Sequence, residues 1–276
     1  MVPAALRTMT PPGWSASLSL RYANRPARTA LVGRRHCGPL SVQRPFYPEI
    51  DGTCHTYILH PPGGIVGGDE LAISLHLDPH TRVLVTTPGA SRWYYSDARR
   101  AEVSQIAVVG NGALLEWLPQ ETLLFDGADA KMSTRVELSG NAQFLGWEVL
   151  GFGRPACQEL FTSGRLDFRF ELWRDGVLIL RERLCGDGLP AGLMGYAGLM
   201  TFVATGADDL ALQAARNVCG NCADVLCAPT LIGDVLICRG LAEECAPLKK
   251  LSCQLWYELR PILSKRDAVM PRIWRT

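Results

Sequence analysis

The sequence lacks the features that mark membrane, exported and nucleic-acid-binding proteins. No apolar run approaches the roughly 18 residues of a membrane-spanning helix, and the first residues contain no apolar core of a secretory signal. The 28 Lys and Arg residues nearly balance the 27 Asp and Glu residues, and no block of like charge stands out. These absences predict a cytoplasmic protein that binds neither a membrane nor a nucleic acid.

Nucleotide-binding motifs are missing too. The glycine-rich stretch HPPGGIVGGDEL (60–71) lacks the Gly-Lys-Ser/Thr of a P-loop and ends on two acids that would repel phosphate. It also precedes a strand pattern, so no helix N-terminus would face an anion there. The stretch GFGRPA (151–156) has the spacing of a dinucleotide fingerprint, but no helical pattern follows it. We therefore expect no nucleotide site at either loop.

Histidine is scarce, and common catalytic motifs are absent. All five histidines lie within residues 36–80. His55 and His60 are an odd number of residues apart on a predicted strand, so their side chains should point to opposite faces. Neither a G-x-S-x-G elbow nor an H-E-x-x-H motif occurs. The spacing therefore predicts no histidine cluster.

The ten cysteines have no regular spacing. The motif CGNC (219–222), followed by Cys227, lacks the second CxxC that a zinc ribbon needs. Buried free thiols are the expected state, with a metal or redox role for Cys219, Cys222 and Cys227 as the alternative.

Short strand patterns fill the first two thirds of the chain. In residues 71–77, Leu and Ile alternate with Ala, Ser and His at a period of two. Similar runs, separated by turn signals such as NG and DG, recur roughly every ten residues. Further strands are predicted at 82–87, 103–109, 113–118, 134–138, 144–152, 165–173 and 177–184. The pattern is typical of a mainly β protein.

Helical patterns are confined to the C-terminal third. Asp208 and Asp209 are predicted to cap a helix through residues 210–218. A second helix is predicted over 241–263, bounded or kinked by its two prolines, with one stripe formed by Leu248, Leu251, Leu255 and Leu259. We predict one β-rich unit over residues 13–276 and a loose segment at residues 1–12.

Single acids interrupt strands that are otherwise apolar. They are Asp69, Glu70, Glu116, Glu148 and Glu182. Burying a carboxylate is costly unless a partner compensates its charge, so such positions need an explanation. One explanation is a set of buried ion pairs with arginines such as Arg92, Arg154 and Arg183. The other is a shared internal channel for a cation, because oxygen donors and water bind a divalent metal loosely.

Several long motifs resemble the UreD (in some bacteria UreH) family of urease accessory proteins. Matching blocks run in order from about Gly13 to Thr276 and match least clearly at 186–236, where CGNC lies. They are GPLSVQRPFYPE (38–49), LHPPGGIVGGDEL (59–71), TTPGASRWYYSD (86–97), LEWLPQET (115–122), GWE (146–148), GRP (153–155) and PRIWRT (271–276).

The resemblance implies a β-helix-like stack of strands with a few α-helices. It implies a scaffold with no catalysis of its own, which binds apo-urease, contacts UreF directly and recruits the GTPase UreG through UreF. It also implies no permanently bound cofactor. Ni²⁺ would be in transit to the urease active site through an internal passage.

Roles transfer by motif onto residues of this chain. The passage would be lined by Asp69, Glu70, Ser91, Glu148 and Glu182. Supporting positions are His60, Gly63, Gly64, Gly67, Gly68, Arg92 and Arg183. Arg92 stands where relatives often have lysine, and Trp93 stands where phenylalanine is common. The glycine loop would then hold two carboxylates at a passage or docking surface, or be only a bend between strands.

Two rival functions remain open. One is a metal-dependent hydrolase that uses the histidines and acids and leaves one coordination position open. The other is a purely structural adaptor with no metal passage.

Overall fold

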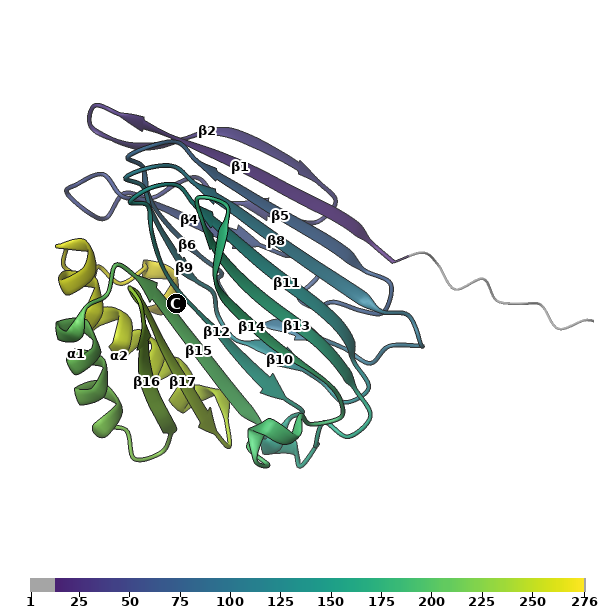
Figure 1. Ribbon diagram of the computed structural model, residues 1–276. Helices are drawn as coiled ribbons and strands as arrows, with labels where there is room; N and C mark the ends of the chain where they lie inside the picture. The colour runs from purple at the N-terminus through teal and green to yellow at the C-terminus, as the bar shows by residue number, and fades with distance from the viewer. Residues whose placement is uncertain (1–12, 276) are drawn as a thin grey trace, which may run out of the picture.

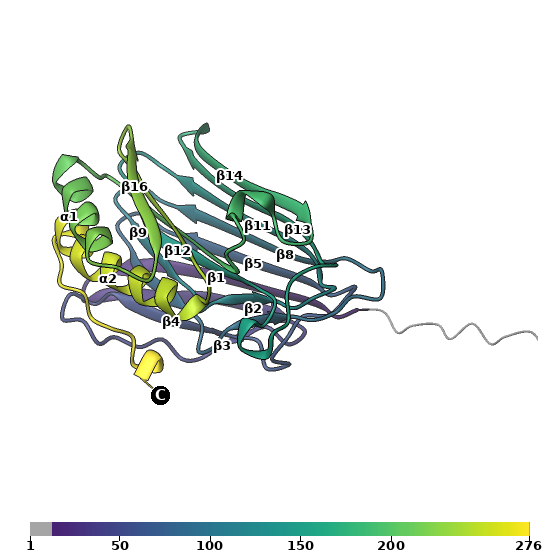
Figure 2. The ribbon, with the colours of Figure 1, turned by 90° about the horizontal axis from the view of Figure 1, so that it is seen from below.

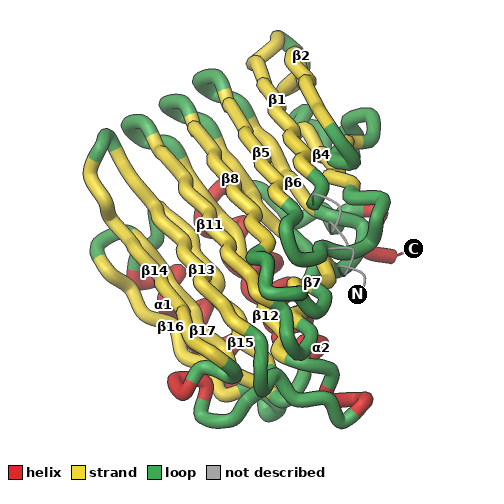
Figure 3. The backbone as a smooth tube through the Cα atoms, turned by 90° about the vertical axis from the view of Figure 1, so that its right-hand side faces the viewer, coloured by secondary structure: helices red, strands yellow, loops and turns green. Residues whose placement is uncertain are grey.

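Successive strands of the chain alternate between two facing sheets (Figure 1). The computed structural model describes residues 13–275, so the predicted loose segment at 1–12 lies outside the described residues. The first sheet contains, in spatial order, β14 (Val177–Asp187), β13 (Arg165–Arg174), β11 (Asp129–Leu138), β8 (Ala101–Val109), β5 (Glu70–Leu77), β1 (Ser15–Arg25) and β2 (Arg28–Cys37). Figure 3 looks onto this sheet and shows these strands side by side.

The second sheet lies opposite the first. In spatial order it contains β16 (Leu226–Ile232), β17 (Val235–Ala242), β15 (Gly198–Thr205), β12 (Gln143–Phe152), β9 (Leu114–Leu118), β6 (Arg82–Thr86), β4 (Cys54–Leu59) and β3 (Ser41–Val42). Two short strands, β7 (Ser91–Trp93) and β10 (Thr122–Leu124), pair with each other, and β10 also pairs with β12. They therefore form a narrow third side where the chain crosses between the sheets.

The winding of the chain explains this topology. From β4 to β13 the main strands enter the second and the first sheet in turn, and each pairs in parallel with the strand one coil earlier. The hairpins β1–β2 and β13–β14, together with β15, β16 and β17, add antiparallel strands at the ends. The predicted β-helix-like stack is confirmed.

Burial alternates along the strands as the sequence period predicts. In β5, Leu71, Leu75 and Leu77 are buried between the sheets, whereas Ala72 and Ser74 are exposed on the outer face. The strand β12 differs because almost every residue of it is buried. Both faces of the second sheet are therefore covered at β12, one by the first sheet and the other by helices.

Two helices cover the outer face of the second sheet (Figures 1 and 2). They are α1 (Asp209–Gly220) and α2 (Cys245–Ser264). The Asp208 side chain caps α1, accepting a hydrogen bond from the backbone N–H of Ala211 at 3.0 Å. The four leucines of the predicted stripe on α2 are fully buried. No helix among residues 13–275 is long and apolar enough to span a membrane.

The start of α2 corrects the predicted boundary. The helix begins at Cys245, not near Leu241, because Leu241 and Ala242 belong to β17 and pair with β15. Pro247 lies in the first helical turn, where the missing N–H is harmless, and Pro261 lies inside the last turns. The prediction that residues 13–276 form a single unit stays a prediction.

Candidate functional site

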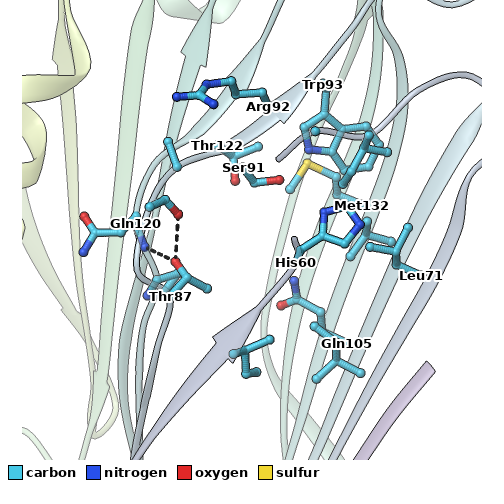
Figure 4. Close-up of a pocket in the computed structure, with 18 of the residues that line it drawn as sticks. His60, Leu71, Thr87, Ser91, Arg92, Trp93, Gln105, Gln120, Thr122 and Met132 are labelled. Carbon is cyan, nitrogen blue, oxygen red and sulfur yellow. Dashed lines mark hydrogen bonds between the residues drawn. The ribbon is translucent and has the colours of Figure 1, made fainter. Parts of the chain in front are cut away.

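A cavity of about 300 Å³ lies between the two sheets, next to the glycine loop and β7 (Figure 4). Its polar lining comes from both sheets and from the loops that join them. Six polar side chains matter here: His60, Ser91, Trp93, Gln105, Thr122 and Glu148. The cavity therefore brings together two of the five predicted passage residues, Ser91 and Glu148, with His60, Gly63, Gly64 and Arg92 of the supporting set.

Glu148 faces the cavity because of the strand period of β12. Trp147 and Val149 pack toward the helices, so Glu148 points between the sheets. Trp117 Nε1 donates a hydrogen bond to Glu148 Oε1 at 3.1 Å, and the carboxylate forms no ion pair with any residue in 13–275. Burial raises the pKa of Glu148 to about 7 despite that hydrogen bond. At neutral pH this carboxyl group exchanges readily between its charged and neutral forms.

The glycine loop is shaped by Asp69. Its carboxylate accepts hydrogen bonds from the backbone N–H of Trp14 at 2.8 Å and of Val66 at 3.0 Å. Asp69 is buried by these contacts and does not line the cavity. The glycine loop thus forms the bend between strands that was one of the two alternatives. Its residues His60, Gly63 and Gly64 line the cavity.

The four glycines of this loop serve two different needs. Gly63 and Gly68 have φ of 74° and 93°, a backbone conformation that other residues avoid. A Cβ on Gly64 would lie 2.0 Å from the Tyr94 ring, and one on Gly67 would lie 2.5 Å from Ser96 Oγ. The paired glycines therefore provide both the turns and the close packing.

His60 reaches the cavity from the start of this loop. Burial lowers its pKa, and the nearby Asp69 charge opposes that shift only in part. The imidazole is therefore neutral at pH 7 and can either donate or accept a hydrogen bond.

Ser91 and Arg92 begin β7, which closes one side of the cavity. Pairing with β10 fixes the strand, and Ser91 N–H donates to Glu121 O at 2.8 Å. The Ser91 hydroxyl faces the open space, whereas the guanidinium of Arg92 points away from it (Figure 4). Arg92 thus contributes its aliphatic stem to the cavity wall.

The other predicted passage acids lie elsewhere. Glu70 is exposed at the start of β5. Glu182 on β14 forms an ion pair with Arg239 on β17, which links the two sheets. Neither lines the cavity, and their passage role stays a prediction. Arg183 pairs with Asp167 at 3.5 Å on the outer face of the first sheet.

The negative charge of Glu116 is balanced by donors from α2 on the outer face of the second sheet. Trp256 Nε1 donates to Glu116 Oε1 at 2.6 Å, and Arg260 Nε donates to the same oxygen at 2.9 Å. Arg260 also binds Glu49 at 2.8 Å, and His55 Nε2 lies 2.6 Å from Glu49 Oε1. The predicted buried ion pair therefore exists for Glu116, but its partner is Arg260. Arg154, one of the arginines named from sequence, pairs instead with Glu159.

Sequence reasoning missed several polar groups of the cavity. Trp93 is 2% exposed, and its Nε1 has no hydrogen-bond partner in the part of the chain that the structure describes. Thr134 on β11 donates to Gln105 Oε1 at 3.1 Å, which leaves the Gln105 NH₂ group available for other contacts. Single Trp, Gln and Thr residues in strands form no recognisable sequence motif. Their position at the cavity becomes visible only once β7, β8 and β10 are placed in the fold.

The histidines and cysteines do not gather into a metal site within residues 13–275. His55 contacts Glu49, His60 faces the cavity, and His76 lies 3.4 Å from Asp78 on the surface. All ten cysteines are free, but only Cys54 and Cys238 are buried as predicted. Five are half-buried, and Cys37, Cys157 and Cys185 are exposed. The sulfur atoms of Cys219 and Cys238 lie 3.4 Å apart where α1 packs on β17.

Comparison with known proteins gives a consistent result over nearly the whole chain. Residues 15–275 match the family described as UreD urease accessory protein. The urease accessory protein UreD of Alcanivorax borkumensis is 42% identical over 274 residues, covering 96% of this chain and 93% of that protein. UreD of Klebsiella aerogenes is 40% identical over 272 residues, covering 97% and 100%. UreD of Chromohalobacter salexigens is 44% identical over 281 residues, covering 95% and 89%.

Proposed function

Since this chain belongs to the UreD family of urease accessory proteins, we propose that it acts in urease maturation. It would bind the urease structural subunits in the cytoplasm, contact UreF directly and recruit UreG through UreF. It would perform no catalysis of its own. The names of its relatives and their identity over nearly the full length support this proposal.

We propose further that Ni²⁺ passes through the cavity between the two sheets. The observation that carries this proposal is Glu148, a buried carboxylate that faces the cavity without a cationic partner among the described residues. Carboxylate, hydroxyl and water oxygens bind Ni²⁺ more loosely than imidazole does, and Ser91 and Thr122 offer hydroxyl groups in the same space. One carboxylate gives a weak station, which suits an ion that must leave again.

We keep two of the predicted passage residues in this proposal. Ser91 and Glu148 are the two predicted passage residues that line the cavity. Asp69 would act indirectly, because it fixes the loop that holds His60. Glu182 would act only on the structure, because its ion pair with Arg239 joins the two sheets.

Complementation tests the proposal. A bacterium with an intact urease operon lacking only its UreD gene would receive this chain with its own UreF, and ammonia release from urea would be measured in nickel-containing medium. We expect activity with the natural chain and a loss of most activity with Glu148→Gln, while copurification with urease is unchanged. Gln keeps the shape of Glu148 and removes the charge that a cation needs.

Glu182→Gln is the matched control, because Glu182 is also an acid in a strand but lies outside the cavity. Full activity of this variant is expected. Equal losses of urease activity in the two variants would mean that an acid in the cavity matters no more than an acid in an ion pair outside it. Full activity of Glu148→Gln would instead favour an adaptor with no metal passage.

A further inference from the structure

One group in the cavity has the wrong polarity for a cation. Trp93 is 2% exposed, yet its indole Nε1–H has no acceptor among residues 13–275. A buried donor without a partner is costly, so it calls for an acceptor from outside the described residues. Water bound to a metal ion turns its hydrogens outward and seeks acceptors, so a hydrated cation does not satisfy this N–H group.

Other donors face the same space. In Figure 4, Trp93 and Ser91 of β7 and Gln105 of β8 surround the open centre. Thr134 occupies the oxygen of Gln105 and leaves its NH₂ group to donate. The lining thus offers an indole, an amide and a hydroxyl donor within one cavity of about 300 Å³.

Charged side chains are few among the described residues around the cavity. The titratable side chains of its lining are His60, Arg92 and Glu148. His60 is neutral because burial lowers its pKa, and Arg92 directs its guanidinium away. Behind Glu148 the smaller adjoining space is lined by Trp117, Phe144, Gly146, Trp147, Phe168, Phe170, Thr201 and Val203, none of which titrates near neutral pH. Glu148 is therefore the one acid of the described residues in or beside the cavity.

We propose that this cavity binds a small oxyanion of the carboxylate class, which accepts a hydrogen bond from Trp93 Nε1–H and further bonds from Gln105 and Ser91. The binding itself is independent of urease. Its use rests on the proposed function: an anion in the cavity lowers the net charge of the passage that Ni²⁺ crosses, and so lowers the cost of removing the ion from water.

Glu148 is the one acid among the described residues that line the cavity. Its substitution by glutamine removes the negative charge and keeps the shape of the side chain. Glu148→Gln should therefore bind the anion more tightly than the natural chain does at the same pH. The same substitution is expected to stop nickel delivery, so the two proposals give opposite results with one variant.

The test is NMR titration of the full chain, labelled with ¹⁵N in its tryptophan side chains, without nickel. Formate or acetate is added at pH 6, with chloride at equal ionic strength as the control. Trp93→Phe identifies the Trp93 signal and removes the donor while keeping a ring. We expect a saturable shift of the Trp93 indole N–H signal with the carboxylates and none with chloride. Ser91→Ala should weaken binding by about tenfold, as expected for one hydrogen bond to a charged ligand.

An unchanged Trp93 signal would overturn the proposal and leave water as the partner of the indole. An equal shift with chloride would overturn it too, because the site would then recognise charge alone. Should Trp93→Phe fail to fold, Ser91→Ala still decides: an unchanged affinity in that variant contradicts the site. Failure of this titration leaves the urease assay untouched, because no nickel or urease is present in it.

Discussion

Two glutamates on paired strands of the second sheet face opposite sides and meet opposite surroundings. Glu116 on β9 points at α2, where Arg260 and Trp256 donate three hydrogen bonds to its carboxylate. Glu148 on β12 points between the sheets, where Trp117 is its one hydrogen-bond donor within residues 13–275. The fold compensates the first charge fully and leaves the second available. This difference separates an acid that holds α2 in place from an acid that can serve a ligand.

The largest expected effect comes from breaking the helix-side network. Arg260→Met would leave Glu116 and Glu49 as buried carboxylates without their cation. We expect a loss of about 3–5 kcal/mol in the free energy of unfolding, measured by urea denaturation of the full chain.

The double variant Glu116→Gln with Arg260→Met sharpens this test. It removes one of the two stranded charges and should recover part of the lost stability. A loss below about 1 kcal/mol for Arg260→Met alone would mean that the network behaves like a surface ion pair.

The second largest expected effect is a gain in stability, and it comes from Glu148 on the cavity side of the second sheet. The pKa of Glu148 is raised from 4.5 to about 7 in the folded chain, so the folded state holds this proton more tightly than the unfolded state. Stability therefore falls as pH rises from about 4.5 to 7 and is level above that. Glu148→Gln should remove this fall and stabilise the chain at pH 8 by an amount on the order of 3 kcal/mol.

Urea denaturation at pH 5, 6, 7 and 8 measures this effect. Glu116→Gln is the control, because it removes the acid that Arg260 and Trp256 bind and should destabilise the chain at every pH. If both glutamine variants destabilise the chain at pH 8, the contrast between the two faces does not hold.

The sequence predicted the periodic parts of the fold well. A two-residue period predicted β5 and its neighbours, and an acid before a periodic run predicted the start of α1. These features depend on neighbours along the chain. The resemblance to a family supplied the β-helix-like winding, which no local pattern specifies.

The partners of the acids could not be predicted, because they depend on distant parts of the chain. Arg260 lies 144 residues from Glu116, and nothing local to either residue joins them. Strands buried on both faces also show no alternation, so the direction of Glu116 and Glu148 was hidden. The unpartnered indole of Trp93 is likewise a property of the closed cavity alone.

The smallest expected effect concerns two adjacent acids that the sequence treated alike. Asp69 is buried and accepts two backbone N–H groups, whereas Glu70 is exposed and begins β5. Asp69→Ala should cost about 1–3 kcal/mol, because it leaves the N–H groups of Trp14 and Val66 without their acceptor. Glu70→Ala should change the free energy of unfolding by less than about 0.5 kcal/mol.

This pair extends the contrast to a third kind of carboxylate, one compensated by the backbone. Asp69→Ala should also lower urease activation, because a released glycine loop no longer positions His60 at the cavity. Asp69→Asn keeps one oxygen acceptor and should recover part of both losses. If Asp69→Ala leaves stability unchanged but stops activation, Asp69 acts on the ion itself. If stability and activation fall and recover together, its role is to shape the loop, and Glu148 remains the carboxylate on which passage depends.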